Sequence, residues 1–344
     1  MIPPKRGATI NPTGRFEKLD VEIDPEFDDP NPRTVYLRDD SRSLITYNDS
    51  PDISFNASLN PYRGCEHGCA YCYARPYHEY LGFSAGLDFE TRIMVKPTAP
   101  ALLRRELSAK TWRPQPLAMS GVTDCYQPVE RKLQITRGCL EVLAEFRNPV
   151  GLVTKNHLIT RDLDLLSRLA AADAVAVFLS ITTLDPTLAR RLEPRASAPA
   201  HRLDAIRQLS QAGIPVSVLV APVLPGITEH EIPAILHAAR EAGAVRAGYT
   251  MLRLPYGVKD VFSAWLDEHL PGAKEKVLGR IQEVRGGRLN DSTFGVRLRG
   301  EGVLAEQIRQ LFEVSVQREG LTKKATPLSV AAFRRPGDEQ LALL

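Results

Sequence analysis

Three of the five cysteines in the chain lie within eight residues, in the segment GCEHGCAYCYARP. Cys65, Cys69 and Cys72 have the spacing C-x3-C-x2-C, which is compact enough to place three sulfur atoms on one small inorganic body. Gly64 and Gly68 leave room for the backbone to bend tightly around such a body. A cluster of four iron atoms takes a ligand on every iron, so three cysteines leave one iron open to a molecule with adjacent amino and carboxylate groups.

Two other kinds of cysteine chemistry are the alternatives to a cluster. A structural zinc site takes four protein ligands, so this segment would have to recruit His67, His78 or a distant cysteine. A set of disulfide bonds is disfavoured because five is an odd number. Bunched cysteines are instead typical of metal binding or catalysis inside a reducing compartment.

The composition is that of a globular protein with a substantial core, since the 344 residues are 43% hydrophobic. No apolar run approaches the roughly 20 residues that span a bilayer, and the first residues lack the apolar core of a signal peptide. We therefore expect a cytoplasmic location and no membrane partner.

Charge is distributed unevenly along the chain. Residues 1–60 hold 7 basic and 11 acidic side chains, a net charge of −4. Residues 246–335 hold 16 basic and 10 acidic side chains, a net charge of +6. A basic C-terminal part is compatible with contact to nucleic acid, although solvated helix faces give similar counts.

The elements that must position the cysteines follow a β-α rhythm. Residues 1–52 are rich in Pro, Asp and Asn and predict an extended N-terminal arm that carries little chemistry itself. Residues 53–285 alternate short apolar runs with amphipathic stretches, and their six β-α units predict an α/β fold, a partial (β/α)6 barrel of the TIM-like kind. For residues 286–344 we expect a C-terminal extension with a short strand and an amphipathic helix that closes the open side of the barrel.

The expected strands of the barrel are residues 54–62, 116–122, 150–155, 174–183, 215–226 and 245–255, with a small extra strand at 92–96. The expected helices begin near Tyr73 and then cover 97–112, 130–147, 159–173, 184–194, 199–213, 228–243 and a charged segment that ends near Val284. Polar residues gather at the carboxyl ends of these strands, where a barrel of this kind has its active site.

The sequence resembles the radical S-adenosylmethionine superfamily, whose defining loop is C-x3-C-x2-C followed by an aromatic residue, as in CEHGCAYCY. It is similar in particular to the branch that contains spore photoproduct lyase and DNA repair photolyases, over roughly residues 55–255. The matching features are, in chain order, C-x3-C-x-Y-C-Y at the cysteines, VTK ending at Lys155, Ser180, Glu193-Pro194, and VAP at Val220 to Pro222.

This resemblance implies two cofactors. A [4Fe-4S] cluster would be held by Cys65, Cys69 and Cys72, and S-adenosylmethionine would bind the open iron through its amino and carboxylate groups. Reduction would cleave S-adenosylmethionine to methionine and a 5′-deoxyadenosyl radical, which abstracts hydrogen from a substrate inside the barrel. The same resemblance implies a reducing partner of the flavodoxin or ferredoxin type.

Candidates for S-adenosylmethionine binding are Tyr71, Ser120, Thr123, Asp124, Lys155 and Ser180. Many superfamily members bind the amino group with a Gly-Gly-Glu-type segment after the second strand. Here Ser120, Thr123 and Asp124 occupy that region, and Asp124 would alternatively cap the following turn. Lys155 matches a lysine that contacts S-adenosylmethionine in spore photoproduct lyase, and Ser180 matches a residue near the cofactor. Their structural alternatives are a surface lysine and a hydrogen-bonded core serine.

Two residues are candidates for the catalytic hydrogen transfer. Spore photoproduct lyase returns a hydrogen atom to its product from a cysteine, and that position corresponds to Gly121 in this chain. Cys125 would substitute if its loop curls inward, with a buried inert thiol as the alternative. Tyr73, beside the third cysteine, would serve as a radical relay or pack against the first helix. Arg253 at the end of the sixth strand would suit an anionic substrate if its side chain points into the barrel.

The function that we expect is that of a radical S-adenosylmethionine enzyme acting on a modified nucleobase or nucleic acid in a lyase-like repair reaction. An enzyme of the same superfamily that modifies a peptide or a small metabolite is the first alternative. The second is a binding module that carries iron-sulfur or zinc and performs no turnover. The sequence has no phosphate-binding loop, dinucleotide-binding turn or nucleophile elbow, which excludes the corresponding common enzyme classes.

Overall fold

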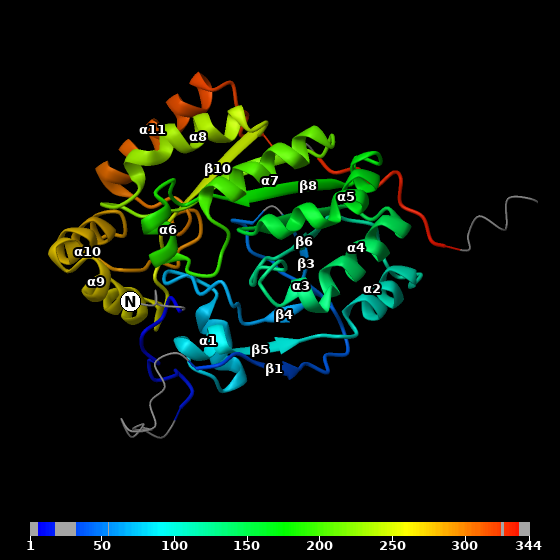
Figure 1. Ribbon diagram of the computed structural model, residues 1–344, viewed down its shortest axis with the longest axis horizontal. Helices are drawn as coiled ribbons and strands as arrows, with labels where there is room; N and C mark the ends of the chain where they lie inside the picture. The colour runs from blue at the N-terminus through cyan, green and yellow to red at the C-terminus, as the bar shows by residue number, and fades with distance from the viewer. Residues whose placement is uncertain (1–5, 18–31, 54, 325–326, 337–344) are drawn as a thin grey trace, which may run out of the picture.

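The computed structural model describes residues 6–17, 32–53, 55–324 and 327–336. Its main sheet has seven strands: β2 (Ile45–Tyr47), β3 (Ala57–Leu59), β6 (Leu117–Met119), β7 (Val150–Thr154), β8 (Val175–Ser180), β9 (Val216–Val223) and β10 (Arg246–Met251). Their order across the sheet is β10-β9-β8-β7-β6-β3-β2 (Figure 1). The six strands from β10 to β3 run parallel, and β2 pairs antiparallel with β3 at the edge. This is the expected α/β fold with six parallel strands of a partial barrel.

A second, three-stranded sheet lies below the main sheet in the view of Figure 1. It consists of β1 (Val35–Arg38), β5 (Arg92–Val95) and β4 (Tyr62–Arg63), in the order β1-β5-β4. The β1 strand is parallel to β5, whereas β4 is antiparallel to it. Both β1 and β2 belong to the segment expected as an extended arm, so this segment contributes one strand to each sheet.

Helices connect the parallel strands and cover the outside of the sheet (Figure 1). The α-helices are α1 (Leu87–Thr91), α2 (Ala99–Ser108), α3 (Glu130–Leu133), α4 (Ile135–Phe146), α5 (Leu163–Ala170), α6 (Pro186–Leu192), α7 (Pro199–Gln211), α8 (Ile232–Glu241), α9 (Val258–His269), α10 (Lys274–Glu283) and α11 (Gly302–Arg318). Short 3₁₀ helices are η1 (Arg75–Leu81), η2 (His157–Asp162), η3 (Glu229–Glu231) and η4 (Pro271–Ala273).

The main core lies between the parallel strands and the helices that follow them. Strands β7, β8 and β9 are rich in Val and Leu because both faces of a parallel sheet in this class are covered. The helices present apolar stripes to the sheet, as in α4, where Leu140 and Leu143 are fully buried. One continuous apolar cluster joins these strands and helices and holds the strand ends in place.

The single long helix expected over residues 130–147 is a pair of helices, α3 and α4. They meet at Gln134, whose φ of 53° is left-handed and interrupts the helical path. The carboxylate of Glu130 accepts hydrogen bonds from the main-chain nitrogens of Thr136 (3.0 Å) and Arg137 (3.4 Å) at the start of α4. That cap replaces the helical hydrogen bonds that the break removes, and a periodicity analysis cannot detect it.

The C-terminal extension packs along the β10 edge of the main sheet. Helix α11 lies beside α8 at the top of Figure 1. Beyond α11, Thr322 forms an isolated parallel bridge with Arg246 of β10. The expected amphipathic helix is therefore present, and the expected strand is a single bridge in the described residues. Among all the residues that the structure describes, no helix is both long and apolar enough to cross a membrane.

Candidate functional site

The loop that carries Cys65, Cys69 and Cys72, called the cysteine loop from here on, comprises residues 64–74 and connects β4 to η1. Gly64 (φ 80°) and Gly68 (φ 66°) have left-handed backbone conformations, which allow the loop to turn on either side of Cys65. The nitrogen of Cys65 donates to the carbonyl of Phe89 over 2.9 Å, and the nitrogen of Cys72 donates to the carbonyl of Cys69 over 3.2 Å. The three thiols are free; two are buried and Cys72 is half-buried. Burial raises the pKa of all three thiols.

The three thiols form a donor set that fits an iron-sulfur cluster. Cys72 packs against two apolar clusters, one that contains Cys65 and one that contains Cys69, so it lies between the parts of the fold that hold the other two thiols. Within the described residues, no three His, Cys, Asp or Glu side chains are arranged to hold a single metal ion. A four-iron cluster takes each thiolate on a different iron, so its three sulfur ligands need not converge on one point.

The two histidines that a zinc site would have to recruit are both engaged elsewhere. His67 lies 3.3 Å from a carboxylate oxygen of Asp124 through Nδ1 and 3.1 Å from the amide of Asn156 through Nε2. Nε2 of His78 contacts the carbonyl of Arg92 over 3.0 Å. Both side chains are buried, so each has a structural role and neither completes a set of four zinc ligands.

A buried polar network surrounds Lys155 at the carboxyl ends of β7, β8 and β9. Nζ of Lys155 lies 3.3 Å from Glu193 Oε1 and donates to the carbonyl of Ala221 (2.9 Å) and to Thr182 Oγ1 (3.4 Å). The hydroxyl of Tyr71 donates to Glu193, and Lys155 Nζ lies 5.8 Å from the centroid of the Tyr71 ring. The predicted residues Lys155 and Tyr71 are thus brought together within the fold.

The charge of Glu193 is balanced from two sides. Burial acts to raise the pKa of Glu193, but the charges of Arg202 and Lys155 outweigh burial and hold that pKa well below its usual range. Arg202 forms an ion pair with Glu193 and donates to the carbonyls of Ser180 (2.9 Å) and Ser197 (2.7 Å). Glu193 is therefore an ionised, buried group.

Arg202 is a member of this network that sequence reasoning missed. It lies on α7, one turn before the buried residues Ala205, Ile206 and Leu209. That i, i+3, i+4, i+7 spacing places an arginine on the apolar face of a helix. A charged residue on such a face requires a buried partner, and this was the available signal.

Asp124 binds the loop after β6 to the end of β7. Its carboxylate accepts from Thr154 Oγ1 (2.8 Å), from the nitrogen of Lys155 (2.8 Å) and from the nitrogen of Tyr126 (2.9 Å). His67 of the cysteine loop is the fourth neighbour. Because these protein groups occupy most of the acceptor positions of one carboxylate, Asp124 orders the site, and the alternative of a turn cap describes part of its role.

The other three candidates for cofactor binding also contribute to the fold. Ser120 has a left-handed φ of 73°, and its Oγ accepts from the nitrogen of Cys125 over 2.8 Å. The hydroxyl of Thr123 donates to the carbonyl of Tyr62 over 2.7 Å. Ser180 is buried in β8 beside the network, and its carbonyl accepts from Arg202. Of these residues, Ser180 lies in direct contact with the buried network.

The two candidates for hydrogen transfer occupy different environments. Cys125 is fully buried in the main core, where burial raises the pKa of its thiol. Tyr73 is partly exposed, and its hydroxyl donates to the carbonyl of Gly121 over 2.8 Å. The guanidinium of Arg253 lies 4.5 Å from the centroid of the Tyr73 ring. The structure therefore groups Tyr73, Gly121 and Arg253 and leaves Cys125 inside the core.

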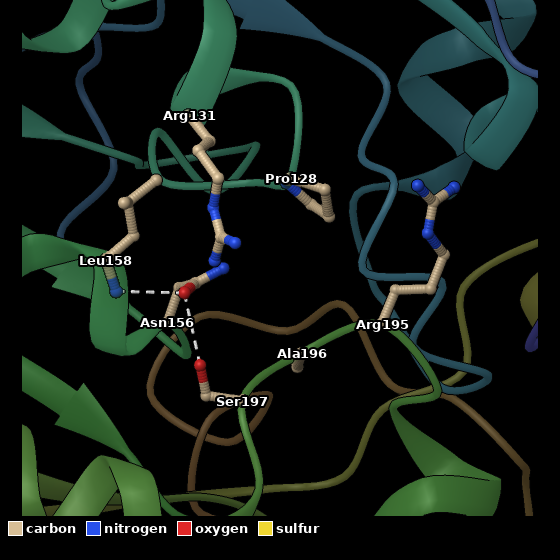
Figure 2. A pocket seen from close by; sticks show the side chains of 7 residues that line it. All are labelled: Pro128, Arg131, Asn156, Leu158, Arg195, Ala196 and Ser197. Carbon is tan, nitrogen blue, oxygen red and sulfur yellow. Dashed lines mark hydrogen bonds between the residues drawn. The ribbon is translucent and has the colours of Figure 1, made fainter.

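A separate cavity of about 380 Å³ lies beside this site (Figure 2). It is lined by Pro128, Arg131, Asn156, Leu158, Arg195, Ala196 and Ser197. Asn156 Oδ1 accepts from the nitrogen of Leu158 (2.9 Å) and from the hydroxyl of Ser197 (3.1 Å), as the dashed lines show. Arg195 is paired with the buried Glu66 over 2.8 Å. The polar groups of this cavity are therefore already largely engaged by the protein.

Comparison with known proteins identifies several relatives. The chain is 37% identical over 216 residues to an uncharacterized protein of Mycobacterium tuberculosis, covering 62% of this chain and 64% of that protein. It is 26% identical over 205 residues to a radical SAM Nα-GlyT isomerase of Pseudomonas phage M6, covering 59% of this chain and 40% of the isomerase. The chain thus spans less than two thirds of the length of these relatives.

Among solved structures, spore photoproduct lyase complexed with dinucleoside spore photoproduct has a similar fold. The TM-score is 0.59 at 16% sequence identity, with 83% of this chain and 80% of that chain covered. In sequence, the profile of the Radical SAM superfamily matches residues 59–239, which is more than half of the chain and includes the cysteine loop. The chain therefore belongs to the radical SAM superfamily, and its cofactors are those of the family, a [4Fe-4S] cluster and S-adenosylmethionine.

Proposed function

We propose that the chain is an enzyme that acts on a modified nucleobase or nucleic acid in a lyase-like reaction. Cys65, Cys69 and Cys72 hold the [4Fe-4S] cluster. When bound and reduced, the cluster with S-adenosylmethionine supplies a 5′-deoxyadenosyl radical. The observation that carries the cofactor-binding part of this proposal is the position of the buried network of Lys155, Tyr71 and Glu193 beside the cysteine loop.

We propose that Lys155 supplies the positive charge for the carboxylate of S-adenosylmethionine, which then replaces one of the three protein acceptors around the ammonium group. Its contacts with Glu193, Thr182 and the carbonyl of Ala221 fix the ammonium group at the carboxyl ends of three neighbouring strands. Glu193 holds the ammonium group of Lys155 in place, and Tyr71 orients Glu193 through its hydroxyl. Because the site is buried, these electrostatic interactions are stronger than they would be in water. Burial also keeps water away from the reaction.

A nucleic-acid substrate is supported by the charge of Arg253. This guanidinium is partly buried just after β10, and among the described residues no carboxylate forms an ion pair with it. Burial lowers the pKa of Arg253, which means that its charge is poorly solvated. An incoming phosphate group would relieve that cost. The fold of spore photoproduct lyase, bound to a dinucleoside spore photoproduct, supports the same substrate class.

A radical SAM enzyme that modifies a peptide or small metabolite is the second candidate. One observation favours it: Gly121 stands where the lyase branch carries its hydrogen-donating cysteine, and Cys125 is fully buried. A reaction that needs no thiol donor would be compatible with this arrangement. In either case we expect a reducing partner of the flavodoxin or ferredoxin type.

An anaerobic experiment tests the enzyme proposal. The protein is reconstituted with iron and sulfide and given dithionite and S-adenosylmethionine, and formation of 5′-deoxyadenosine is measured. We expect 5′-deoxyadenosine from the reconstituted protein and none from a Cys69→Ala variant. If no 5′-deoxyadenosine forms although the cluster is intact, and if loss of zinc destabilises the fold, the protein is a binding module.

The substrate is tested by binding to single-stranded and double-stranded DNA at increasing salt. We expect affinity to fall as salt rises, because phosphate contacts release counterions. Negligible binding that does not depend on salt would contradict a nucleic-acid substrate and favour the peptide or metabolite reaction.

A further inference from the structure

The outer side of the cysteine loop is covered by the N-terminal segment Arg6–Ala8. The main-chain nitrogens of Gly7 and Ala8 donate to the carboxylate of Glu90 over 3.0 and 2.8 Å. Nη1 of Arg6 donates to the carbonyl of Glu90 over 3.3 Å. The N-terminal segment, which was expected to carry little chemistry, is therefore bound to Glu90, next to the cysteine loop.

Gly7 and Gly68 lie backbone against backbone. A Cβ atom at Gly7 would be 1.5 Å from the carbonyl oxygen of Gly68 and 3.2 Å from the nitrogen of Ala70. A Cβ atom at Gly68 would be 2.6 Å from Oε2 of Glu90. The first of these contacts is with rigid backbone, so any side chain at Gly7 would push the N-terminal segment away from the loop.

Glu90 connects this segment to a cluster ligand through Arg75. Arg75 is fully buried, and its Nε and Nη2 donate to the carbonyl of Cys69 over 3.0 and 2.8 Å. Its Nη2 also forms an ion pair with Glu90. The loop has only long internal hydrogen bonds, of 3.4 Å from Gly68 to Cys65 and 3.2 Å from Cys72 to Cys69. The loop therefore depends on external contacts for its shape, and those of Arg75 act beside the hydrogen bonds of Glu66 with Gln127 and of Ala70 with Leu192.

We propose that Gly7 and Glu90 are positioning residues for the cluster. Gly7 lets the N-terminal segment close on the cysteine loop, and Glu90 passes that contact through Arg75 to the carbonyl of Cys69. Outer contacts of this kind orient a metal ligand and determine how firmly the metal is held. The proposal rests on the cluster-binding part of the proposed function and is independent of the substrate.

Thiol labelling of the metal-free, full-length protein tests the role of Gly7. In a Gly7→Ala variant we expect iodoacetamide to label Cys69 about tenfold faster, equivalent to about 1.4 kcal/mol of easier loop opening. Gly14→Ala is the matched control, because a Cβ atom at Gly14 would meet only the side chain of Glu17. Mass spectrometry resolves each cysteine, and the fully buried Cys139 reports whether the fold is intact.

A Glu90→Gln variant tests the contact from Glu90 through Arg75 to the cluster ligand Cys69. This variant keeps the proposal testable if Gly7→Ala unfolds the whole protein. We expect the reconstituted variant to lose iron to a chelator about tenfold faster and to show a shifted electron paramagnetic resonance spectrum when reduced. Glu106→Gln is the control, because Glu106 likewise accepts from two main-chain nitrogens, of Leu44 and Ile45, in a different part of the fold.

These outcomes separate positioning from general stability. A purely structural role would lower the amount of folded protein in both glutamate variants without changing the spectrum of the cluster. Equal iron loss and equal spectra for Glu90→Gln and Glu106→Gln would overturn the proposal, as would unchanged labelling of Cys69 in a folded Gly7→Ala variant. Absence of 5′-deoxyadenosine formation would contradict the proposed function alone, since neither readout here depends on turnover.

Discussion

The hydroxyl of Tyr73 donates a hydrogen bond to the carbonyl of Gly121 over 2.8 Å. Gly121 is the position at which the spore photoproduct lyase branch carries its donor cysteine, so a phenol O–H group lies where this chain lacks a thiol. Tyr73 follows the cluster ligand Cys72 directly in the chain. Cys125, by contrast, is fully buried in the core. Of the two candidates, Tyr73 is therefore the one that we propose for hydrogen transfer.

Tyr73→Phe is expected to lower product formation by about tenfold or more while S-adenosylmethionine cleavage continues, because only the transferable hydrogen is removed. The measurement compares product with 5′-deoxyadenosine, using the substrate that supports turnover. Cys125→Ala is the comparison: it should destabilise the fold by about 1 kcal/mol through the lost core packing, and leave the ratio of product to 5′-deoxyadenosine unchanged. The reverse pattern would assign the donor role to Cys125.

Each of the variants Cys65→Ala, Cys69→Ala and Cys72→Ala is expected to prevent assembly of a stable [4Fe-4S] cluster, because a cluster with two protein ligands is held too weakly. Iron content and visible absorption after anaerobic reconstitution provide the measurement. Cys139→Ala, which changes a cysteine of the core, should retain the cluster. A variant of the three that keeps full iron content would remove that residue from the ligand set.

Lys155→Met is expected to weaken S-adenosylmethionine binding by about tenfold, or about 1.4 kcal/mol, because a charge-assisted contact is lost. The dissociation constant can be measured by calorimetry on the reconstituted protein. Lys132→Met removes an equal charge from an exposed position on α3 and should bind like the wild type. Equal affinity in all three proteins would show that Lys155 only supports Glu193.

The ion pair of Glu193 with Arg202 predicts a pH dependence of stability. The pKa of folded Glu193 is held well below its usual range, whereas unfolded glutamate titrates near about 4.3. The contribution of Glu193 is therefore present in full above the unfolded pKa and is lost as pH falls toward the folded pKa. Urea unfolding of the metal-free protein from about pH 6 to about pH 3 should show a steeper loss of stability in the wild type than in Glu193→Gln.

At neutral pH, Glu193→Gln is expected to cost about 3 kcal/mol, because Arg202 and Lys155 lose their buried counter-charge. Glu275→Gln, at an exposed position of α10, is the control and should change the free energy of unfolding little. Parallel pH curves for the wild type and Glu193→Gln would show that folding does not lower the pKa of Glu193.

Arg253→Gln is expected to weaken binding of a DNA oligonucleotide by about tenfold and to reduce the dependence of affinity on salt, since one phosphate contact is removed. Arg318→Gln removes the same charge from the exposed end of α11 and should have little effect. Arg131→Gln tests the separate cavity of Figure 2 in the same assay. Weaker binding in Arg131→Gln alone would move the nucleic-acid contact to that cavity.

Local patterns in the sequence predicted most of the fold and the centre of the site. Apolar runs and amphipathic stretches predicted all six parallel strands, and the spacing of Cys65, Cys69 and Cys72 predicted the cluster only together with the resemblance to the radical S-adenosylmethionine superfamily. Such features are visible in sequence because they depend on neighbours within a few residues. The break between α3 and α4 was missed because it lies at the left-handed Gln134 and is stabilised by a side-chain cap from Glu130, which a periodicity analysis cannot detect.

The tertiary structure alone decided which polar groups meet. Glu193 and Lys155 are 38 positions apart and form a buried ion pair, and the carboxylate of Glu90 lies 83 positions from the nitrogen of Gly7 that it binds. Cys125 and Tyr73 are both side chains that can donate a hydrogen atom, but Cys125 is buried in the core, whereas the hydroxyl of Tyr73 reaches the carbonyl of Gly121. Periodicity in the sequence reports which face of a helix or strand is apolar. Which polar side chains pair with each other depends on how distant elements pack. Burial makes an unpaired charge costly, and so it selects the arrangement in which the charges are paired.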